Sequence, residues 1–245
     1  MRLLNVSTRK LEEFQGPRPR YAILSHTWGK EEVTFEDLKT SDYTEKLGYK
    51  KIDGCCKQAQ KARIEYVWID TCCINKSSSA ELSEAINSMF EWYARSRVCY
   101  IYLSDVPPAS LDEHKKPGSL FRSSRWFTRG WTLQELLAPK NRMLFDSSWQ
   151  QVKILSEITD IRIECLQTIA NRSRRLRTPL HEFSVSERMS WASRRKTTRE
   201  EDVAYCLLGI FGVNMPLLYG EGKRAFHRLQ EEIIRMTPDE TILCW

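Results

Sequence analysis

The neighbours of one acidic residue, Glu135, suit it to a catalytic role. The segment Arg125–Pro139 reads RWFTRGWTLQELLAP and sets Glu135 among two tryptophans, two arginines and a glutamine. On a helix, Trp131 and Glu135 would lie four residues apart on one face, and Arg125 and Arg129 on another. An acid beside a flat aromatic ring and guanidinium groups could cleave a bond in a ligand with a base and a phosphate. The alternative is a core helix with an acid at its edge, because apolar stripes at helical spacing usually face a core.

Four short apolar runs predict the strands that would position this segment. They are rich in aromatic or β-branched residues without strict alternation, which is typical of strands buried on both faces of a parallel sheet. The runs are Tyr21–Ser25, Tyr66–Asp70, Val98–Leu103 and Arg142–Phe145. Helical patterns lie between them, so the alternating order predicts right-handed crossovers and a doubly wound α/β sheet.

Three apolar stripes predict the connecting helices. The first runs from Ile52 to Ala62 and the second from Leu82 to Tyr93. Ser78 and Glu81 precede the second stripe at the spacing of a capping box, which satisfies backbone N–H groups at a helix start. The third predicted helix is Arg125–Ala138, which a proline ends.

The second half of the chain has a different pattern. It predicts helices over residues 154–169, 203–211 (closed by Gly212) and 225–234, with an arginine-rich loop over 172–177. Because no linker separates the halves, we expect an α/β core at 1–150 and a helical C-terminal part of the same domain at 151–245. The apolar end at Trp245 suggests that the native protein continues.

Polar side chains gather where the predicted strands end. Ligands of open α/β sheets bind outside the carboxyl ends of the strands, where the strand order reverses. The residues at these ends are Ser25, His26, Thr27 and Trp28, then Asp70, Thr71 and Asn75, then Ser104 and Asp105. Individually each fits a structural role: Asp70 as a cap or turn residue, His26 as a structural histidine, Asp105 as a turn residue. Together they predict a binding site at this edge.

Composition and motifs exclude several classes of protein. Hydrophobic residues at 41% and charged residues at 29% are typical of a globular protein, and no apolar run approaches the roughly 18–20 residues of a membrane span. The charged start MRLLNVSTRKLEEF does not fit a signal peptide, so we expect a soluble, cytoplasmic protein without membrane contact. GxGxxG, GxxxxGK[ST], GxSxG and HExxH are all absent.

The cysteines and the positive charge have ordinary explanations. The eight cysteines include no CxxC pair and the four histidines do not cluster with them, so we expect reduced core thiols and no metal site. The net charge of +6 comes partly from residues 172–177 and 194–199, which we interpret as solvated loops. No nucleic-acid motif accompanies them, which makes a nucleic-acid partner the weakest alternative, while anionic ligands stay open.

Four long motifs in order closely resemble the fungal HET domain of heterokaryon incompatibility proteins. They are AILSHTWG (Ala22–Gly29), VWIDTCCIN (Val67–Asn75), RWFTRGWTLQELLAP (Arg125–Pro139) and RMSWASRRKTTREEDVAYCLLGIFGVNMPLLYGEG (Arg188–Gly222). The resemblance covers nearly the whole chain. It implies a role in fungal non-self recognition, an innate immune response in which the domain triggers programmed cell death.

HET domains are in turn distantly similar to TIR domains, which implies a flavodoxin-like parallel sheet. Several TIR domains cleave NAD at the nicotinamide–ribose bond with a glutamate in a W-C-x-x-E-L pattern. The segment Trp131–Leu136 matches this spacing, with Thr132 in place of the cysteine. The resemblance therefore implies that Glu135 is the catalytic residue of an NAD hydrolase, with NAD or a related nucleotide as substrate and no cofactor.

The remaining predicted site residues would bind the dinucleotide. Trp28, Trp131 or Tyr102 could stack on a base, and Arg125 or Arg129 could neutralise the pyrophosphate. His26, Asp70 and Asp105 would position ribose hydroxyls, with Ser104 at the same edge. The alternative function is a non-enzymatic death-signalling module that associates with itself or a partner protein. Glu135 would then belong to the core or an interface.

Overall fold

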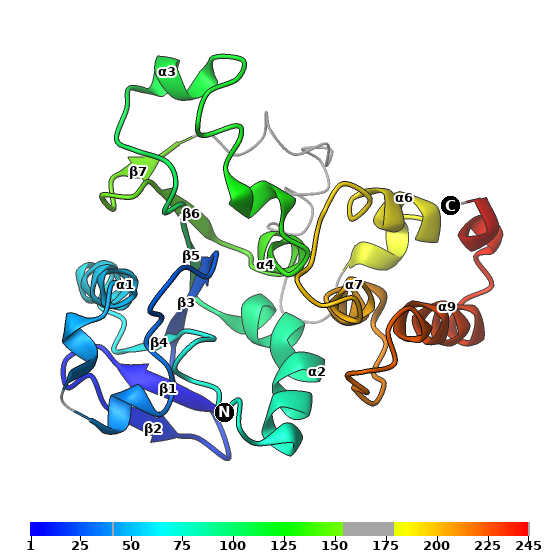
Figure 1. Cartoon of the computed structure of the whole chain (residues 1–245), viewed down its shortest axis with the longest axis horizontal. Helices are drawn as coiled ribbons and strands as arrows, with labels where there is room; N and C mark the ends of the chain where they lie inside the picture. Colours follow the sequence, from blue (N-terminus) through cyan, green and yellow to red (C-terminus); the bar gives the residue numbers. More distant parts are fainter. Residues whose placement is uncertain (41, 154–178, 245) are drawn as a thin grey trace.

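The computed structural model describes residues 1–40, 42–153 and 179–244, and its centre is a seven-stranded mixed sheet (Figure 1). The strand order is β2-β1-β4-β3-β5-β6-β7. The strands are β1 Arg2–Asn5, β2 Leu11–Glu13, β3 Tyr21–His26, β4 Tyr66–Trp68, β5 Val98–Tyr102, β6 Arg142–Phe145 and β7 Gln151–Val152. The four predicted strands pair in parallel as β4-β3-β5-β6, which confirms the predicted α/β sheet. Strands β1, β2 and β7, which the sequence patterns did not predict, pair antiparallel at the two edges.

Helices cover both faces of the parallel strands (Figure 1). Helix α1 (Tyr49–Lys61) lies on one face, and α2 (Ser79–Arg95) and α4 (Thr132–Leu137) pack together on the other. This is the two-sided arrangement that right-handed crossovers produce when the strand order reverses next to β3. Ser78 caps α2 as predicted, because its side chain accepts a hydrogen bond from the backbone N–H of Glu81.

The predicted helix Arg125–Ala138 is wrong as one continuous element. A 3-10 turn covers Arg125–Thr128, the backbone of Arg129 is extended, and α4 begins only at Thr132. The interruption has a tertiary cause, because the backbone N–H of Gly130 donates to the carbonyl of Lys196. A strand-like contact with a distant segment therefore replaces one turn of helix.

The C-terminal helices pack on the α2 and α4 side of the sheet (Figure 1). They are α6 Val185–Ser190, α7 Asp202–Tyr205, α8 Leu208–Phe211 and α9 Arg224–Met236. The smaller elements are α3 Leu111–Lys115 and the 3-10 helices Asp37–Lys39, Asp42–Glu45, Pro179–Glu182 and Glu240–Cys244. The predicted helix over 203–211 is divided into α7 and α8, and Gly212 ends α8 in the left-handed conformation. The predicted helix at 154–169 and the loop at 172–177 lie outside the described residues.

One contiguous set of buried hydrophobic side chains extends from the sheet into these C-terminal helices. All six residues of β3 are buried, so this strand lies at the centre of the core. Across the described ranges, no helix combines the length and the hydropathy that crossing a bilayer requires.

Candidate functional site

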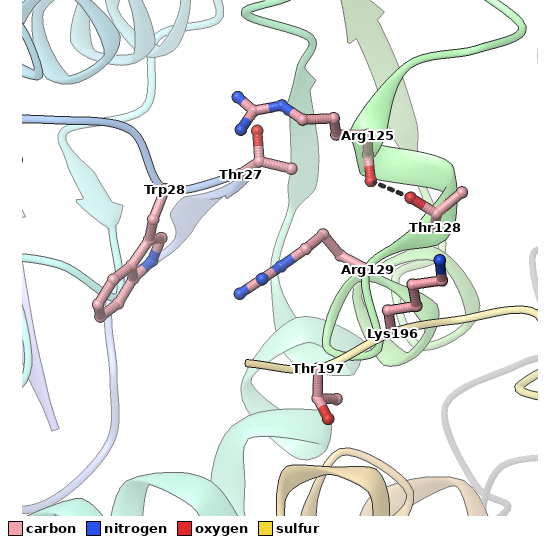
Figure 2. A pocket seen from close by; sticks show the side chains of 7 residues that line it. All are labelled: Thr27, Trp28, Arg125, Thr128, Arg129, Lys196 and Thr197. Atoms are coloured by element: carbon pink, nitrogen blue, oxygen red, sulfur yellow. Dashed lines mark hydrogen bonds between the residues drawn. The ribbon is translucent and has the colours of Figure 1, made fainter. Parts of the chain in front are cut away.

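A pocket of about 180 Å³ lies at the carboxyl end of β3, where the sequence predicted a site. Its lining residues are Thr27, Trp28, Arg125, Thr128, Arg129, Lys196 and Thr197 (Figure 2). The guanidinium groups of Arg125 and Arg129 extend toward Thr27 and Trp28 (Figure 2). The combination of cations and an indole ring suits an anionic ligand that carries an aromatic group.

The two residues at the end of β3 send their side chains to opposite faces of the sheet, because side chains alternate along a strand. His26 lies on the α1 face, where its Nδ1 is 3.0 Å from Nζ of Lys51. Ser25 lies on the α4 face, where its hydroxyl donates to Oε2 of Glu135 over 2.5 Å. The predicted group of His26, Asp70 and Glu135 is therefore divided by the strand itself.

On the α1 face, buried charges are paired. Lys51 forms an ion pair with Glu32 and also donates to the carbonyl of Thr27 over 3.2 Å. Because a lysine ammonium can only donate, Nδ1 of His26 accepts, and Nε2 is free to donate to Asp70 over 2.9 Å. His26 thus joins the Lys51–Glu32 pair to Asp70.

Asp70 holds the pocket residue Trp28. Its second carboxylate oxygen accepts the indole N–H of Trp28 over 2.8 Å, and Nζ of Lys76 lies 3.4 Å from the indole ring. Burial alone would raise the pKa of Asp70, but hydrogen bonds from His26 and Trp28 and the charge of Lys76 outweigh it and keep the pKa well below its ordinary value. Asp70 is consequently an ionised anchor for an exposed aromatic ring.

On the α4 face, Glu135 is hydrogen-bonded to a neutral group. The Ser25 hydroxyl that donates to Glu135 accepts the indole N–H of Trp126 over 2.8 Å. Nearby, the Tyr93 hydroxyl donates its proton to the carbonyl of Leu24 over 2.9 Å. Burial raises the pKa of Glu135 to about 8, which the hydrogen bond from Ser25 only partly opposes. Glu135 is 7% exposed and does not line the pocket.

The other predicted residues have distinct positions. Asp105 accepts from the Ser124 hydroxyl and the Arg125 backbone N–H, each over 2.8 Å, so it fixes the start of the 3-10 turn beside the pocket. Trp131 bonds Asp202 of α7 and lies outside the pocket lining, as does the exposed Ser104. The structure thus brings Trp28, Arg125 and Arg129 together at the pocket.

Lys196, Thr197 and Arg195 were missed as site residues. The interpretation of 194–199 as a solvated loop is wrong for Arg195, whose guanidinium donates to the carbonyl of Arg129 over 2.9 Å and to Thr132 Oγ1 over 2.8 Å. Burial lowers the pKa of Arg195 to about 10. No local pattern distinguishes this arginine from its neighbours, because its role depends on a segment more than sixty residues away.

The remaining candidates for chemistry are metal-ligating side chains and cysteine thiols. In the parts of the chain that the structure describes, no group of three or more His, Cys, Asp and Glu side chains is arranged to hold a metal ion. The cysteines Cys55, Cys72 and Cys99 are buried free thiols, and burial is the main or a leading cause of their raised pKa values.

Comparison with known proteins identifies the family. Residues 21–118 match the family described as heterokaryon incompatibility protein (HET). The chain is similar to the vegetative incompatibility protein HET-E-1 of Podospora anserina, with 46% identity over 89% of this chain and 16% of that relative. No solved structure matches significantly. On these two matches, the chain belongs to the heterokaryon incompatibility (HET) family.

Proposed function

We propose that this chain triggers the cell-death reaction of fungal non-self recognition, and that it does so by hydrolysing NAD at the nicotinamide–ribose bond. Its similarity to a vegetative incompatibility protein supports the first part. The observation that carries the second part is the position of Glu135. This carboxyl, with a pKa of about 8, is bonded to Ser25, which precedes the pocket residue Thr27 by two positions in the chain.

The proposed reaction breaks the bond between C1′ of the ribose and the ring nitrogen of nicotinamide. The bonding electrons go to the positively charged nitrogen, so nicotinamide leaves neutral and needs no general acid. The ribose becomes an oxocarbenium-like cation, which the Glu135 carboxylate stabilises. Water adds to C1′ and releases one proton, giving nicotinamide and ADP-ribose. One well-placed charged group contributes about 3–4 kcal/mol to such a step.

The substrate itself would bring Glu135 into its reactive form. A carboxyl with a pKa of about 8 is mostly protonated near pH 7. An adjacent positive charge favours the carboxylate, so the cationic nicotinamide ring would lower this pKa and release a proton on binding. In the free enzyme, kcat/KM should therefore rise with pH up to about 8.

The proposed reaction requires the site to open. Pockets for ligands of drug size usually measure about 300–1,000 Å³. The cavity of about 180 Å³ therefore admits only part of a dinucleotide, and the buried Glu135 is not among its lining residues. We propose that separation of Glu135 from Ser25 exposes the carboxyl, and that self-association or a signalling partner drives this change.

The test follows nicotinamide release from NAD by the purified chain, as isolated and with a fused oligomerisation domain. We expect release from the wild type and loss of at least a hundredfold in Glu135→Gln, with an unchanged circular dichroism spectrum. Glu84→Gln, which removes an exposed carboxylate from α2, is the matched control and should retain activity. Equal rates for the wild type and Glu135→Gln would refute the catalytic role.

A second candidate is a non-enzymatic module that signals by association. The burial of Glu135, with a hydroxyl partner on the α4 face, favours this alternative. It predicts that the assembled wild type releases no nicotinamide and that Glu135→Gln kills cells as efficiently as the wild type. A cell-death assay in a fungal host, with cellular NAD measured in parallel, separates the two functions.

A further inference from the structure

We infer that Lys196 is a phosphate-binding residue of this pocket, and that it completes with Arg125 and Arg129 a subsite for a pyrophosphate group. The inference rests on the proposed function, because it names the part of the nucleotide that the pocket holds. It adds a residue that lies outside the α/β core and beyond residues 21–118, where the family match ends.

Lys196 is held in place by backbone contacts. Its N–H donates to the carbonyl of Thr128 over 2.7 Å, and its own carbonyl accepts from the N–H of Gly130 over 2.9 Å. The preceding Arg195 bonds the carbonyl of Arg129 and the hydroxyl of Thr132. These contacts fix residues 195–197 against the turn that carries both arginines, so the three cations are held on neighbouring segments.

The charges of the pocket are largely uncompensated. Arg125 lies 3.6 Å from a carboxylate oxygen of Asp105, and Nη1 of Arg129 donates to the hydroxyl of Thr198. Within the described residues, neither Arg129 nor Lys196 forms an ion pair, and the pocket lining includes no acidic side chain. Figure 2 shows the Lys196 ammonium beside Thr128 and the guanidinium groups of Arg125 and Arg129 on the side of Thr27 and Trp28, so the cations line different sides of the cavity. Such a group of cations suits the negative charges of a pyrophosphate.

The size of the cavity agrees with this assignment. A volume of about 180 Å³ is too small for a dinucleotide but has room for a pyrophosphate-sized group. The exposed face of Trp28 borders the same cavity, so a base attached to the phosphates could stack at its edge. A bound pyrophosphate would join the C-terminal part of the chain to the core, because its oxygens would contact residues of both.

The experiment measures binding of inorganic pyrophosphate to the purified chain by calorimetry at low salt. We expect Lys196→Met to weaken binding at least tenfold, which corresponds to about 1.4 kcal/mol, and Lys196→Arg to restore most of it. Lys50→Met is the matched control, because it removes the same charge from an exposed position on α1. The control should bind pyrophosphate within twofold of the wild type.

Two results would overturn the subsite. One is a folded wild type that does not bind pyrophosphate, and the other is an equal loss of affinity in Lys196→Met and Lys50→Met. Binding by both wild type and Glu135→Gln, without nicotinamide release from NAD by either, would support the subsite while refuting the hydrolase. Nicotinamide release by the wild type, together with unchanged pyrophosphate binding in Lys196→Met, would support the hydrolase while refuting the subsite.

Discussion

Ser25 and His26 are neighbours in β3, yet their side chains enter opposite faces of the sheet and meet different electrostatic environments. On the α1 face, His26 belongs to a chain of paired charges that includes Lys51, Glu32 and Asp70. On the α4 face, Ser25 bonds the acid Glu135 among hydroxyl and indole groups. The half-buried Asp70 is thus ionised on one face, whereas the buried Glu135 is mostly protonated on the other. For Asp70 the hydrogen-bond partners and charges outweigh burial, and for Glu135 burial outweighs its partners.

The largest expected effect on stability comes from removing the Lys51–Glu32 ion pair on the α1 face. Lys51→Met leaves the half-buried Glu32 without its cation and removes a donor from His26, so we expect a loss of about 3–5 kcal/mol in the free energy of unfolding. Urea denaturation near pH 7 measures it. Lys50→Met should change stability by less than about 0.5 kcal/mol. A loss below about 1 kcal/mol in Lys51→Met would show that the charges are solvated.

The two faces should also respond oppositely to pH. The folded pKa of Glu135 is raised from 4.5 to about 8, so the folded state keeps a proton that the unfolded chain has lost. Its contribution to the free energy of unfolding is therefore present below about pH 4.5 and falls as pH rises toward 8, by up to about 1.4 kcal/mol per pH unit. Glu135→Gln should remove this decline and become the more stable protein by a few kcal/mol at pH 8.

Asp70 gives the free energy of unfolding the opposite dependence on pH. Its folded pKa lies below 3.8, so its contribution is present above that pH and is lost as pH falls through the folded value. Denaturation curves of wild type, Glu135→Gln and Asp70→Asn from pH 3 to 9 separate the two. A wild type and Glu135→Gln with parallel pH profiles would contradict the raised pKa of Glu135.

A smaller effect is expected from the link between β3 and α4. Ser25→Ala removes the donor to Glu135 and the acceptor for the Trp126 indole, at a cost of about 1–3 kcal/mol. Because the Ser25 hydrogen bond lowers the pKa of Glu135, its loss should raise that pKa further. Carboxyl-carbon NMR of labelled glutamate can follow the titration. A lower pKa in Ser25→Ala would mean that water replaces the hydroxyl.

The smallest effect concerns Ser104, which is exposed and lies outside the pocket lining. We expect Ser104→Ala to change stability by less than about 0.5 kcal/mol and to leave nicotinamide release within twofold of the wild type. The assays described above measure both. A larger loss of activity would place the site further along the edge of β5.

The central fold was predictable because its signals are local. The runs at β3 to β6, the stripe of α9 and the capping serine of α2 each carry a pattern within a few residues. The edge strands β1, β2 and β7 are two to four residues long and were missed, because they are too short for a periodicity.

The candidate site was predictable only in part. Trp28, Arg125 and Arg129 line the pocket, but Lys196 reaches it through contacts that no local pattern reveals. His26 and Glu135 lie on opposite sides of β3, which the sequence did not reveal, because a motif does not tell which side of a sheet each residue faces. The catalytic role of Glu135 stays a prediction.

Gly130 has a consequence for how the chain can vary. A Cβ at this position would lie 2.6 Å from Cγ2 of Thr197 and 3.1 Å from the Cys206 sulfur. Even the methyl group of alanine would therefore clash with the C-terminal segment, push it away from the core and move Lys196 away from the arginines. The contact between the core and the C-terminal segment at Gly130 requires a residue without a side chain. A single methyl group added there would separate the two parts without disturbing the sheet.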